Sequence, residues 1–263
     1  MISLKSAREL ALMREAGRIV AEVLARVREV VTPGITTLDL ERIADEIIVG
    51  KYEAVPSFKG YRGFPGMVCA SVNEEIVHGI PDRRVLSEGD IVSVDVGVIY
   101  KGFHGDAATT VAVGRIDAES QQLMEVTAAS LRIGIEAAVP GNWTSDISKA
   151  IQGYVEAQVH GQPDARGRRQ RYSVVREYTG HGIGRQMHED PQIPNYYDPR
   201  VGGRVRLRPG MTFALEPMVN LGDWRTRVLD NEWTVVTADG KRSAHFENTV
   251  AVTKNGPEIL TKL

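Results

Sequence analysis

The chain of 263 residues is long enough for one large domain or two closely packed halves, and its 42% of hydrophobic residues can fill a sizeable core. A formal net charge of −2 excludes a strong overall attraction to nucleic acid or to an anionic membrane. The single cysteine, Cys69, excludes an internal disulfide and a cysteine-rich zinc site. A reducing compartment is therefore favoured, and the cytoplasm is the expected location. The first 18 residues have no apolar core of a secretory signal, and no segment has the length of a membrane span.

The N-terminal segment predicts two helices. SARE at 6–9 matches a capping box, and apolar residues follow it at helical spacing to about Val31. A Pro-Gly turn at 33–34 and a cap at Thr36 or Thr37 then introduce a second amphipathic helix.

The next distinct pattern is a strand hairpin that carries two acids. In IVSVDVGVIY, residues 91–100, valines alternate with small or polar residues that include Asp95, which predicts a strand with the valines on one face. If Lys101-Gly102 is a two-residue turn, Asp106 lies opposite Gly97 and within about 5 to 8 Å of Asp95. Two ionised carboxylates this close repel each other, so one is protonated or a cation lies between them. A metal ion is the economical explanation, and a buried acid held by backbone N–H groups is the alternative.

Two segments of the second half are open to more than one interpretation. RGRRQR at 166–171 is either a solvated loop or a contact with RNA or another polyanion, and its basic residues are Arg166, Arg168, Arg169 and Arg171. GHGIGRQMHEDPQIP at 180–194 carries His181 and His188 among glycines and prolines. Alone, these histidines could be ligands, acid/base groups or structural residues.

The motifs occur twice in the same order. The turn and helix start at 33–40 return at 140–147, an offset of 107 residues, again after a helical segment. The other pairs are HGIP (78–81) with HGIG (181–184), LSEGDIVSVDVGV (86–98) with LRPGMTFALEPMV (207–219), and TVAV (110–113) with TVAV (249–252). The repetition predicts a single domain, 1–263, with duplicated halves of roughly 1–115 and 116–263 around a pseudo-twofold axis. Each half reads helix, helix, strand, strand, which predicts an α+β fold with helices covering an antiparallel sheet.

The duplication superimposes residues that can bind a metal. Four carboxylates and one or two imidazoles suit a pair of divalent ions of the Mn, Co, Fe or Zn type, with shared carboxylates between them. The superimposed pairs are Asp95 with Glu216, Asp106 with Glu247 and His78 with His181.

Together these motifs resemble the type I methionine aminopeptidases, which form subfamily A of the M24 peptidases in the pita-bread metallopeptidase superfamily. The resemblance covers nearly the whole chain and implies the pita-bread (creatinase/aminopeptidase) fold. It also implies removal of the initiator methionine from nascent polypeptides, with a small second residue preferred. The motifs are SVNEEIVHGIP (71–81), VDVGVIYKGFHGDAATT (94–110), YTGHGIGRQMHEDPQIPN (178–195), ALEPM (214–218) and HFENTVAV (245–252).

The resemblance further implies a role for each site residue. A hydroxide bridging two divalent ions (Co, Mn, Fe(II) or Zn) would attack the peptide carbonyl, with Glu216 as proton shuttle and His78 and His188 orienting the peptide. The implied metal ligands are Asp95, Asp106, His181, Glu216 and Glu247, of which Asp106 and Glu247 would bridge the ions. The implied substrate pocket is Phe58, Tyr61, Phe64, Cys69, His78, Met187, His188 and Trp233. The aromatic and sulfur-containing members could equally be plain core, and the family usually has a small residue at Phe58 and often an aromatic at Met187.

Two other functions fit parts of the pattern. Prolidases and aminopeptidase P, which cleave Xaa-Pro bonds, use the same metal set but resemble two-domain proteins, whereas here the first helix begins within ten residues of Met1. A non-catalytic pita-bread binding protein would lack metal ligands, and all five are present. The expected partners are nascent polypeptide N-termini and, through the arginines at 166–171, the ribosome. No membrane partner is expected, and the chain is expected to be a monomer.

Overall fold

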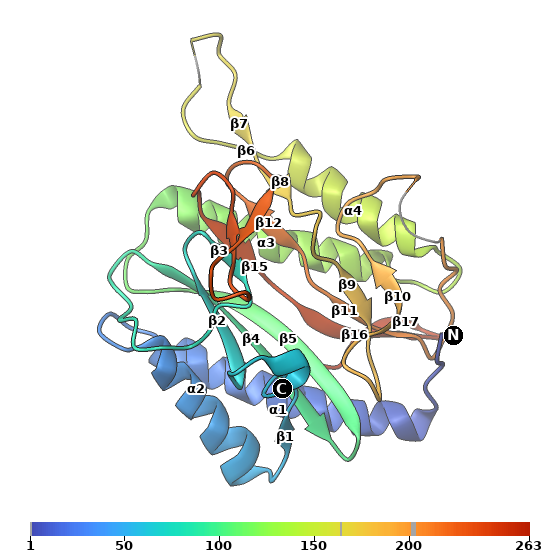
Figure 1. The fold of residues 1–263 in the computed structure, drawn as a ribbon. Coiled ribbons are helices and arrows are strands. Elements are labelled where there is room, and N and C mark those ends of the chain that lie inside the picture. Colours follow the sequence, from blue (N-terminus) through green and yellow to red (C-terminus); the bar gives the residue numbers. More distant parts are fainter. Residues whose placement is uncertain (1, 164, 201–203) are drawn as a thin grey trace.

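The computed structural model describes residues 2–163, 165–200 and 204–263. Helices cover a set of antiparallel sheets, and every strand pair within the described ranges is antiparallel, as the α+β prediction requires (Figure 1). The helices are α1 (Ala7–Val30), α2 (Thr37–Asp45), α3 (Ala118–Ala137) and α4 (Thr144–Ala157), with a π-helical turn η1 (Glu46–Lys51) and a 3₁₀ turn η2 (Tyr61–Gly63).

The strands form two larger sheets and three small ones. The first larger sheet joins β4 (Ile91–Tyr100) to β5 (Phe103–Ala112) on one side and to β1 (Val55–Pro56) and β2 (Val68–Val72) on the other. The second has the order β10 (Glu189–Ile193), β9 (Gly180–Gly182), β11 (Thr212–Leu215), β16 (Asn248–Thr253), β17 (Gly256–Ile259). The small sheets are β15 (Ser243–His245), β12 (Met218–Asn220), β8 (Ser173–Val174); β13 (Thr226–Val228), β14 (Val235–Thr237), β3 (Glu75–Val77); and β6 (Val159–His160), β7 (Gln170–Arg171).

The first two helices begin where their caps predict. Ser6 and Glu9 form the reciprocal capping box of α1, and Thr36 caps α2 with Asp39 as its partner. The apolar face of α1 packs on the valines of β4 in one core cluster. Because side chains alternate along a strand, Asp95 is directed to the opposite face of the sheet, away from α1.

Helix α1 also crosses β5 at unusually short range. A Cβ added to Gly17 would lie 2.3 Å from the carbonyl oxygen of Leu260, and one added to Gly105 would lie 2.8 Å from the nitrogen of Gly17. Glycine at these positions therefore lets the helix backbone contact both the strand and the C-terminal segment directly.

The second half differs from the predicted helix, helix, strand, strand order. α3 and α4 pack on each other and on the β11–β16 side, as expected, but the strands are divided into many short pieces from β6 to β17 (Figure 1). The cap of α4 is Trp143, and Thr144 is the first helical residue. The tryptophan side chain has no oxygen to accept a hydrogen bond, so the Asp146 carboxylate is the capping side chain, accepting from the Trp143 N–H at 2.9 Å, and the Asp146 N–H donates to the Trp143 carbonyl at 2.9 Å.

The arginine segment forms part of a hairpin that projects from the body of the molecule (Figure 1). β6 and β7 pair through Val159 with Arg171 and His160 with Gln170. The arginine side chains at 166–171 are exposed, as the solvated-loop interpretation expects. Within the described residues, no helix has the combination of length and apolar character needed to span a membrane.

Candidate metal centre and substrate pocket

The β4–β5 hairpin places Asp95 and Asp106 on one face of the sheet. Gly97 pairs with Asp106 and Asp95 pairs with Ala108, so the register predicted from the two-residue turn is confirmed. The Oδ1 atoms of both acids are buried and have no hydrogen-bond partner. Buried carboxylate oxygens are nearly always paired, so these two atoms need a cation or a proton.

Glu216 and Glu247 come from the other half of the chain. Glu216 directly follows β11 and Glu247 directly precedes β16, and these two strands pair with each other. The N–H of Glu247 donates to the Ala108 carbonyl at 3.0 Å, and the Ala108 N–H donates to the Glu247 carbonyl at 3.3 Å. The Thr249 hydroxyl accepts from the Asp106 N–H at 2.9 Å and donates to the Asp106 carbonyl at 2.8 Å. These bonds join β5 to the start of β16 and bring the acids of both halves together.

His181 lies on β9, which pairs with both β10 and β11. Its Nδ1 lies 2.9 Å from the Gly182 carbonyl, which only accepts, so Nδ1 carries the proton and Nε2 keeps its lone pair. Burial lowers the pKa of His181 to about 3, so the ring is neutral near pH 7. Its Nε2 lies 3.5 Å from Oε1 of Glu216. Because both atoms present lone pairs, this contact is favourable only with a cation or a proton between them.

Three ligand atoms form the tightest group. One atom each from Asp106, His181 and Glu247 lies within 4.8 Å of the others, and all three residues are buried. Asp95 and Glu216 line the same cavity. Carboxylate oxygens with an imidazole nitrogen and no thiolate suit Mn, Fe, Co or Zn, so the residues fit a divalent metal centre.

The pKa values of the four acids also indicate a site for a cation. Burial raises the pKa of Asp95 and of Asp106 well above the usual carboxyl range, and the neighbouring carboxylates raise it further. Burial and the other acids likewise raise the pKa of Glu216 and Glu247. The raised pKa values mean that these acids lose their protons less readily than free carboxyl groups, and a bound cation would reverse this effect.

One cavity of about 160 Å³ collects the candidate residues. Every residue expected from the sequence to be a ligand, a catalytic group or part of the substrate pocket contributes to its wall. The wall consists of Phe58, Tyr61, Arg62, Phe64, Cys69, His78, Asp95, Asp106, His181, Met187, His188, Glu216, Trp233 and Glu247.

The apolar part of the wall is a slot beside the acids. Phe64 meets Trp233 edge to face with ring centroids 5.2 Å apart. Phe58 and Met187 are buried in the same cluster. A Cβ on Gly97 would lie 2.8 Å from Cε1 of Phe58, so this aromatic ring occupies the space next to the strand glycine.

Two further histidines border the acids. The ring of His188 lies 4.1 Å from that of His181, and its Nδ1 is 2.9 Å from the Tyr61 hydroxyl. His78 has a left-handed backbone, with φ of 61°, and its ring meets Tyr178 edge to face. Burial lowers the pKa of His78 to about 4, and burial and Arg62 lower the pKa of His188. The two rings are therefore neutral hydrogen-bonding groups near pH 7.

Known proteins with similar sequences belong to a metal-dependent peptidase family, in agreement with this arrangement of residues. The model of "Metallopeptidase family M24" matches residues 11–254. The chain is 51% identical to methionine aminopeptidase 1 of Bacillus subtilis over 263 residues, 100% of each chain. It is 52% identical to methionine aminopeptidase of Clostridium perfringens over 261 residues, 99% of each chain. The chain belongs to the methionine aminopeptidases of metallopeptidase family M24.

Solved structures agree with this membership. The crystal structure of methionine aminopeptidase from Thermotoga maritima matches with a TM-score of 0.92 and 48% identity, covering 100% of both chains. The expected pita-bread fold is thereby confirmed. The prolidase from Pyrococcus horikoshii matches with a TM-score of 0.73 and 20% identity over 98% of this chain but 63% of its own. That similarity concerns the fold alone.

Two residues at this site, Arg62 and His245, were not predicted from the sequence. Arg62 lines the cavity from a left-handed position, φ of 50°, with its guanidinium over the Tyr61 ring. The buried Nε2 of His245 lies 3.9 Å from both Glu216 and Glu247. Because burial lowers the pKa of His245 to about 3, the ring is neutral and these contacts are not ion pairs. HFENTVAV contains His245, so closeness to Glu247 was the available signal, whereas no pattern indicated Arg62.

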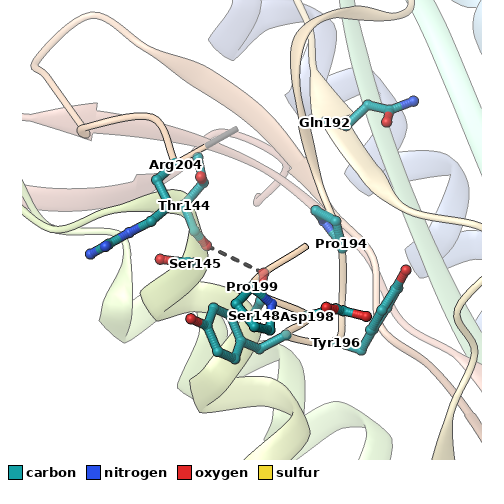
Figure 2. A pocket seen from close by; sticks show the side chains of 10 residues that line it. Thr144, Ser145, Ser148, Gln192, Pro194, Tyr196, Asp198, Pro199 and Arg204 are labelled. Carbon is teal, nitrogen blue, oxygen red and sulfur yellow. Dashed lines mark hydrogen bonds between the residues drawn. The ribbon is translucent and has the colours of Figure 1, made fainter. Parts of the chain in front are cut away.

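A separate pocket lies at the N-terminal end of α4 and shares no lining residue with the candidate site (Figure 2). The hydroxyl-bearing residues Thr144, Ser145 and Ser148 line it together with Asp198 and Arg204. Its described wall has one carboxylate and no imidazole, so it lacks the donors of the metal centre.

Proposed function

We propose that this chain removes the N-terminal methionine of polypeptides by metal-dependent hydrolysis of the first peptide bond. The observation that carries the proposal is that an acid–imidazole cluster and an apolar slot open into one cavity. The first supplies the hydrolytic chemistry and the second recognises the side chain. The methionine aminopeptidase relatives, 51% identical over the full length, support the same activity.

The metal ligands in this proposal are the five residues expected from the sequence. Two divalent ions held there would acidify a water molecule and polarise the peptide carbonyl. The bonds that join Glu247 to Ala108 place that carboxylate beside Asp106, which supports these two residues as the shared ligands. The free α-amine of the substrate would bind to one of these ions, which restricts cleavage to the N-terminal residue.

The remaining polar groups act on the substrate. Glu216 is the proton carrier, taking the proton of the attacking water and passing it to the leaving amine, because its carboxyl group lines the cavity beside the other ligand residues. With Tyr61 donating to Nδ1 of His188, the imidazole proton lies on Nε2 and can be donated to the substrate carbonyl. His78, neutral and buried, orients the peptide.

The apolar slot is the methionine pocket. A thioether is unbranched and polarisable, and it makes favourable contacts with the edges of aromatic rings such as Phe64 and Trp233. Charged side chains are disfavoured there because the slot offers no partner for them. The preference for a small second residue rests on the family resemblance.

Nascent polypeptide N-termini are the natural substrates in this proposal, and the enzyme acts as a cytoplasmic monomer. The cytoplasmic location rests on the sequence, because the single cysteine, Cys69, forms no internal disulfide. The arginine segment at 166–171 is the part of the chain proposed to contact the ribosome, where these substrates are made.

The proposal is tested with metal-stripped protein resupplied in turn with Mn, Co, Fe(II) and Zn. Released amino acids are measured from Met-Ala-Ser, Leu-Ala-Ser and Ala-Pro-Ala. Free methionine released only from the first peptide, and only with added metal, is the expected result. Cleavage confined to Ala-Pro-Ala would assign an Xaa-Pro peptidase, and no turnover with any metal would assign a binding protein.

A matched pair of variants locates the activity. Asp106→Asn removes a charged ligand from the tight group, so metal content and turnover are both expected to fall by at least about 100-fold. Asp198→Asn makes the same chemical change in the α4 pocket and is expected to keep both. Equal effects of the two changes would reject the proposed metal centre.

A further inference from the structure

A polar groove continues from the catalytic cavity. The groove has a volume of about 430 Å³, and its wall shares Arg62, His181 and His188 with the wall of the cavity. Its other described lining residues are all polar or charged, in contrast to the apolar slot for the methionine side chain. When methionine fills that slot, the rest of the peptide has to leave the cavity by another opening, and this groove provides one.

Arg62 lies where the cavity and the groove meet, in a left-handed turn. Its φ is 50°, and the neighbouring Gly60 and Gly63 have φ of 80° and 91°. A left-handed backbone is unfavourable for a residue with a side chain, and such strain is found most often at ligand-binding and active sites. The turn places the exposed guanidinium over the ring of Tyr61, with 5.5 Å between its central carbon and the ring centroid.

The guanidinium lies within a few residues' length of the bond to be cleaved. The Tyr61 hydroxyl is 2.9 Å from Nδ1 of His188, the histidine proposed to donate to the substrate carbonyl. After burial, the positive charge of Arg62 is the second cause that lowers the pKa of His188, so the two groups are close enough to interact. An extended peptide advances about 3.4 Å per residue, so its second or third residue comes level with Arg62.

The alternation of side chains along an extended peptide selects the third residue. Side chains two positions apart point to the same side, so the third side chain lies on the side of the methionine and the second on the opposite side. Tyr61 and Phe64, which line the cavity on the methionine side, flank Arg62 in the sequence. The third side chain of the substrate is therefore the one directed to Arg62.

The charge of Arg62 is available to a ligand. Within the described ranges Arg62 forms no ion pair with an acid of this chain. Glu189, an acid of the groove wall, already accepts hydrogen bonds from Lys5 and from the Arg185 N–H. Asp190 lines the groove but not the cavity, so a peptide that leaves the cavity passes Arg62 before it passes Asp190.

We propose that Arg62 selects substrates that have aspartate or glutamate as their third residue. This inference rests on the proposed function, and it adds a recognised side chain to the methionine and the small second residue. A guanidinium binds a carboxylate through two parallel hydrogen bonds, whereas it repels a lysine at the same place. Because the pair forms in the bound substrate as well as in the transition state, it acts on KM more than on kcat.

The test compares kcat/KM for three amidated peptides, Met-Ala-Asp-Gly-NH2, Met-Ala-Asn-Gly-NH2 and Met-Ala-Lys-Gly-NH2. Aspartate and asparagine have the same shape, so the ratio of their kcat/KM values isolates the charge. The unmodified protein is expected to prefer aspartate to asparagine by about 2- to 5-fold and to lysine by about 10-fold at low salt. In about 0.5 M KCl the preference is expected to shrink, because salt screens a partly exposed ion pair.

Variants of Arg62 test whether this residue causes the preference. Arg62→Gln is expected to bring the ratio of aspartate to asparagine to about 1, and Arg62→Lys is expected to keep part of it. Arg62→Glu is expected to reverse the order, so that the lysine peptide is cleaved faster than the aspartate peptide. Arg83→Gln removes an exposed arginine that lines neither the cavity nor the groove and is expected to keep the original ratio. Each ratio is measured within one protein, so a general loss of activity does not change it.

Three results would overturn the inference while the peptidase proposal stands. These are equal kcat/KM for the aspartate and asparagine peptides in the unmodified protein, an unchanged order of peptides in Arg62→Glu, and equal loss of the preference in Arg62→Gln and Arg83→Gln. In each of them methionine is still released. If no methionine is released from any of the three peptides, the proposed function fails and this inference fails with it.

Discussion

Some of the buried polar atoms that lack a hydrogen-bond partner lie at or beside the catalytic cavity, while others, such as those of Ser145 and Tyr172, lie elsewhere. Asp95, Asp106, His245 and Glu247 each contribute one such oxygen or nitrogen atom. An unpaired buried polar atom costs about 1 to 3 kcal/mol, and more when it is charged, so a stable protein tolerates a cluster of them only for a function. A divalent ion is the partner that satisfies oxygens and an imidazole nitrogen together.

Replacing His188 separates catalysis from metal binding. His188→Gln removes the imidazole proposed to donate to the substrate carbonyl, so kcat is expected to fall by about 10²- to 10³-fold. Metal content by mass spectrometry is expected to stay unchanged, since His188 lies outside the tight ligand group. The matched control is His160→Gln, a buried histidine paired with Glu119, and it is expected to keep kcat. Loss of metal from His188→Gln would make His188 a ligand instead.

A second variant, Tyr61→Phe, tests the hydrogen bond between Tyr61 and His188. Tyr61→Phe keeps the ring stacked on His188 but removes the hydroxyl 2.9 Å from Nδ1, so the imidazole loses the bond that fixes its proton. A bond of about 0.5 to 1.5 kcal/mol corresponds to a fall in kcat of about 3- to 10-fold. KM for Met-Ala-Ser is expected to change little. A rise in KM with unchanged kcat would assign Tyr61 to the methionine slot alone.

Among the individual residues of the site, the four acids were predicted from the sequence, but Arg62 and His245 were not. The acids could be predicted because alternation along β4 and the repeated motifs place them without reference to distant residues. Arg62 reaches the cavity through a left-handed backbone, and His245 through the pairing of β15 with β12. The backbone at Arg62 leaves no local pattern, and the signal for His245 was only its position two residues before Glu247, because long-range packing decides where both side chains lie.

The crossing of α1 over β5 fixes the hairpin that carries Asp106. Helix and strand backbones touch at Gly17 and Gly105, so any added side chain forces them apart. The same helix holds the C-terminal segment at Leu260. Because Gly105 directly precedes Asp106, a shift of α1 would also shift this proposed metal ligand.

Two alanine substitutions in helices are expected to have opposite effects on stability. Gly17→Ala places a Cβ 2.3 Å from the Leu260 carbonyl oxygen and is expected to lower the free energy of unfolding by about 1 to 3 kcal/mol. Gly153→Ala in α4 meets nothing within 4 Å and is expected to raise it by about 0.5 to 1 kcal/mol. Urea denaturation measures both. Equal stabilisation by the two changes would contradict the close crossing.

Elements defined by local chemistry were predicted well, and those defined by distant partners were not. The capping box of α1 and the two-residue turn of the β4–β5 hairpin depend on residues a few positions apart. The β6–β7 pairing depends on closing a loop between residues 160 and 170, and the short strands of the second half pair with segments far along the chain. The cap at Trp143 follows no residue preference, because the surrounding fold sets where α4 begins.

The proposed metal centre joins the two halves of the molecule. Asp95 and Asp106 belong to the first half, and His181, Glu216 and Glu247 belong to the second. The origin of the halves by duplication, with boundaries near 1–115 and 116–263, stays a prediction. An ion bound by both halves stabilises the folded chain, by about 2.7 kcal/mol at a concentration 100-fold above Kd.

Metal removal is expected to change how stability depends on pH. The pKa values of the four acids are raised in the metal-free folded state, so above the ordinary carboxyl range this state binds more protons than the unfolded chain. Its free energy of unfolding is therefore expected to fall as pH rises. The histidines of the site, whose pKa values are lowered from 6.5, have the opposite effect below that pH and do not contribute above it, because they are then neutral in both states.

Urea denaturation at pH 7, 8 and 9, with EDTA or with excess Mn, measures this difference. The metal-loaded protein is expected to show a flatter dependence, and addition of Mn to the metal-free protein in weak buffer is expected to release protons. Identical pH dependence with and without metal would show that the acids are ionised in the metal-free state.

The division of the ligands between two halves also determines when the enzyme can first act during its own synthesis. Ribosomes build a chain from its N-terminus, and Glu247 is added 152 positions after Asp95 (247 − 95). An emerging chain that has not reached Glu247 lacks one acid of the tight group, whatever its first half has already folded into. A copy that is still being made therefore lacks the complete set of proposed ligands, and before that point its own first residue can be removed only by another, finished enzyme molecule.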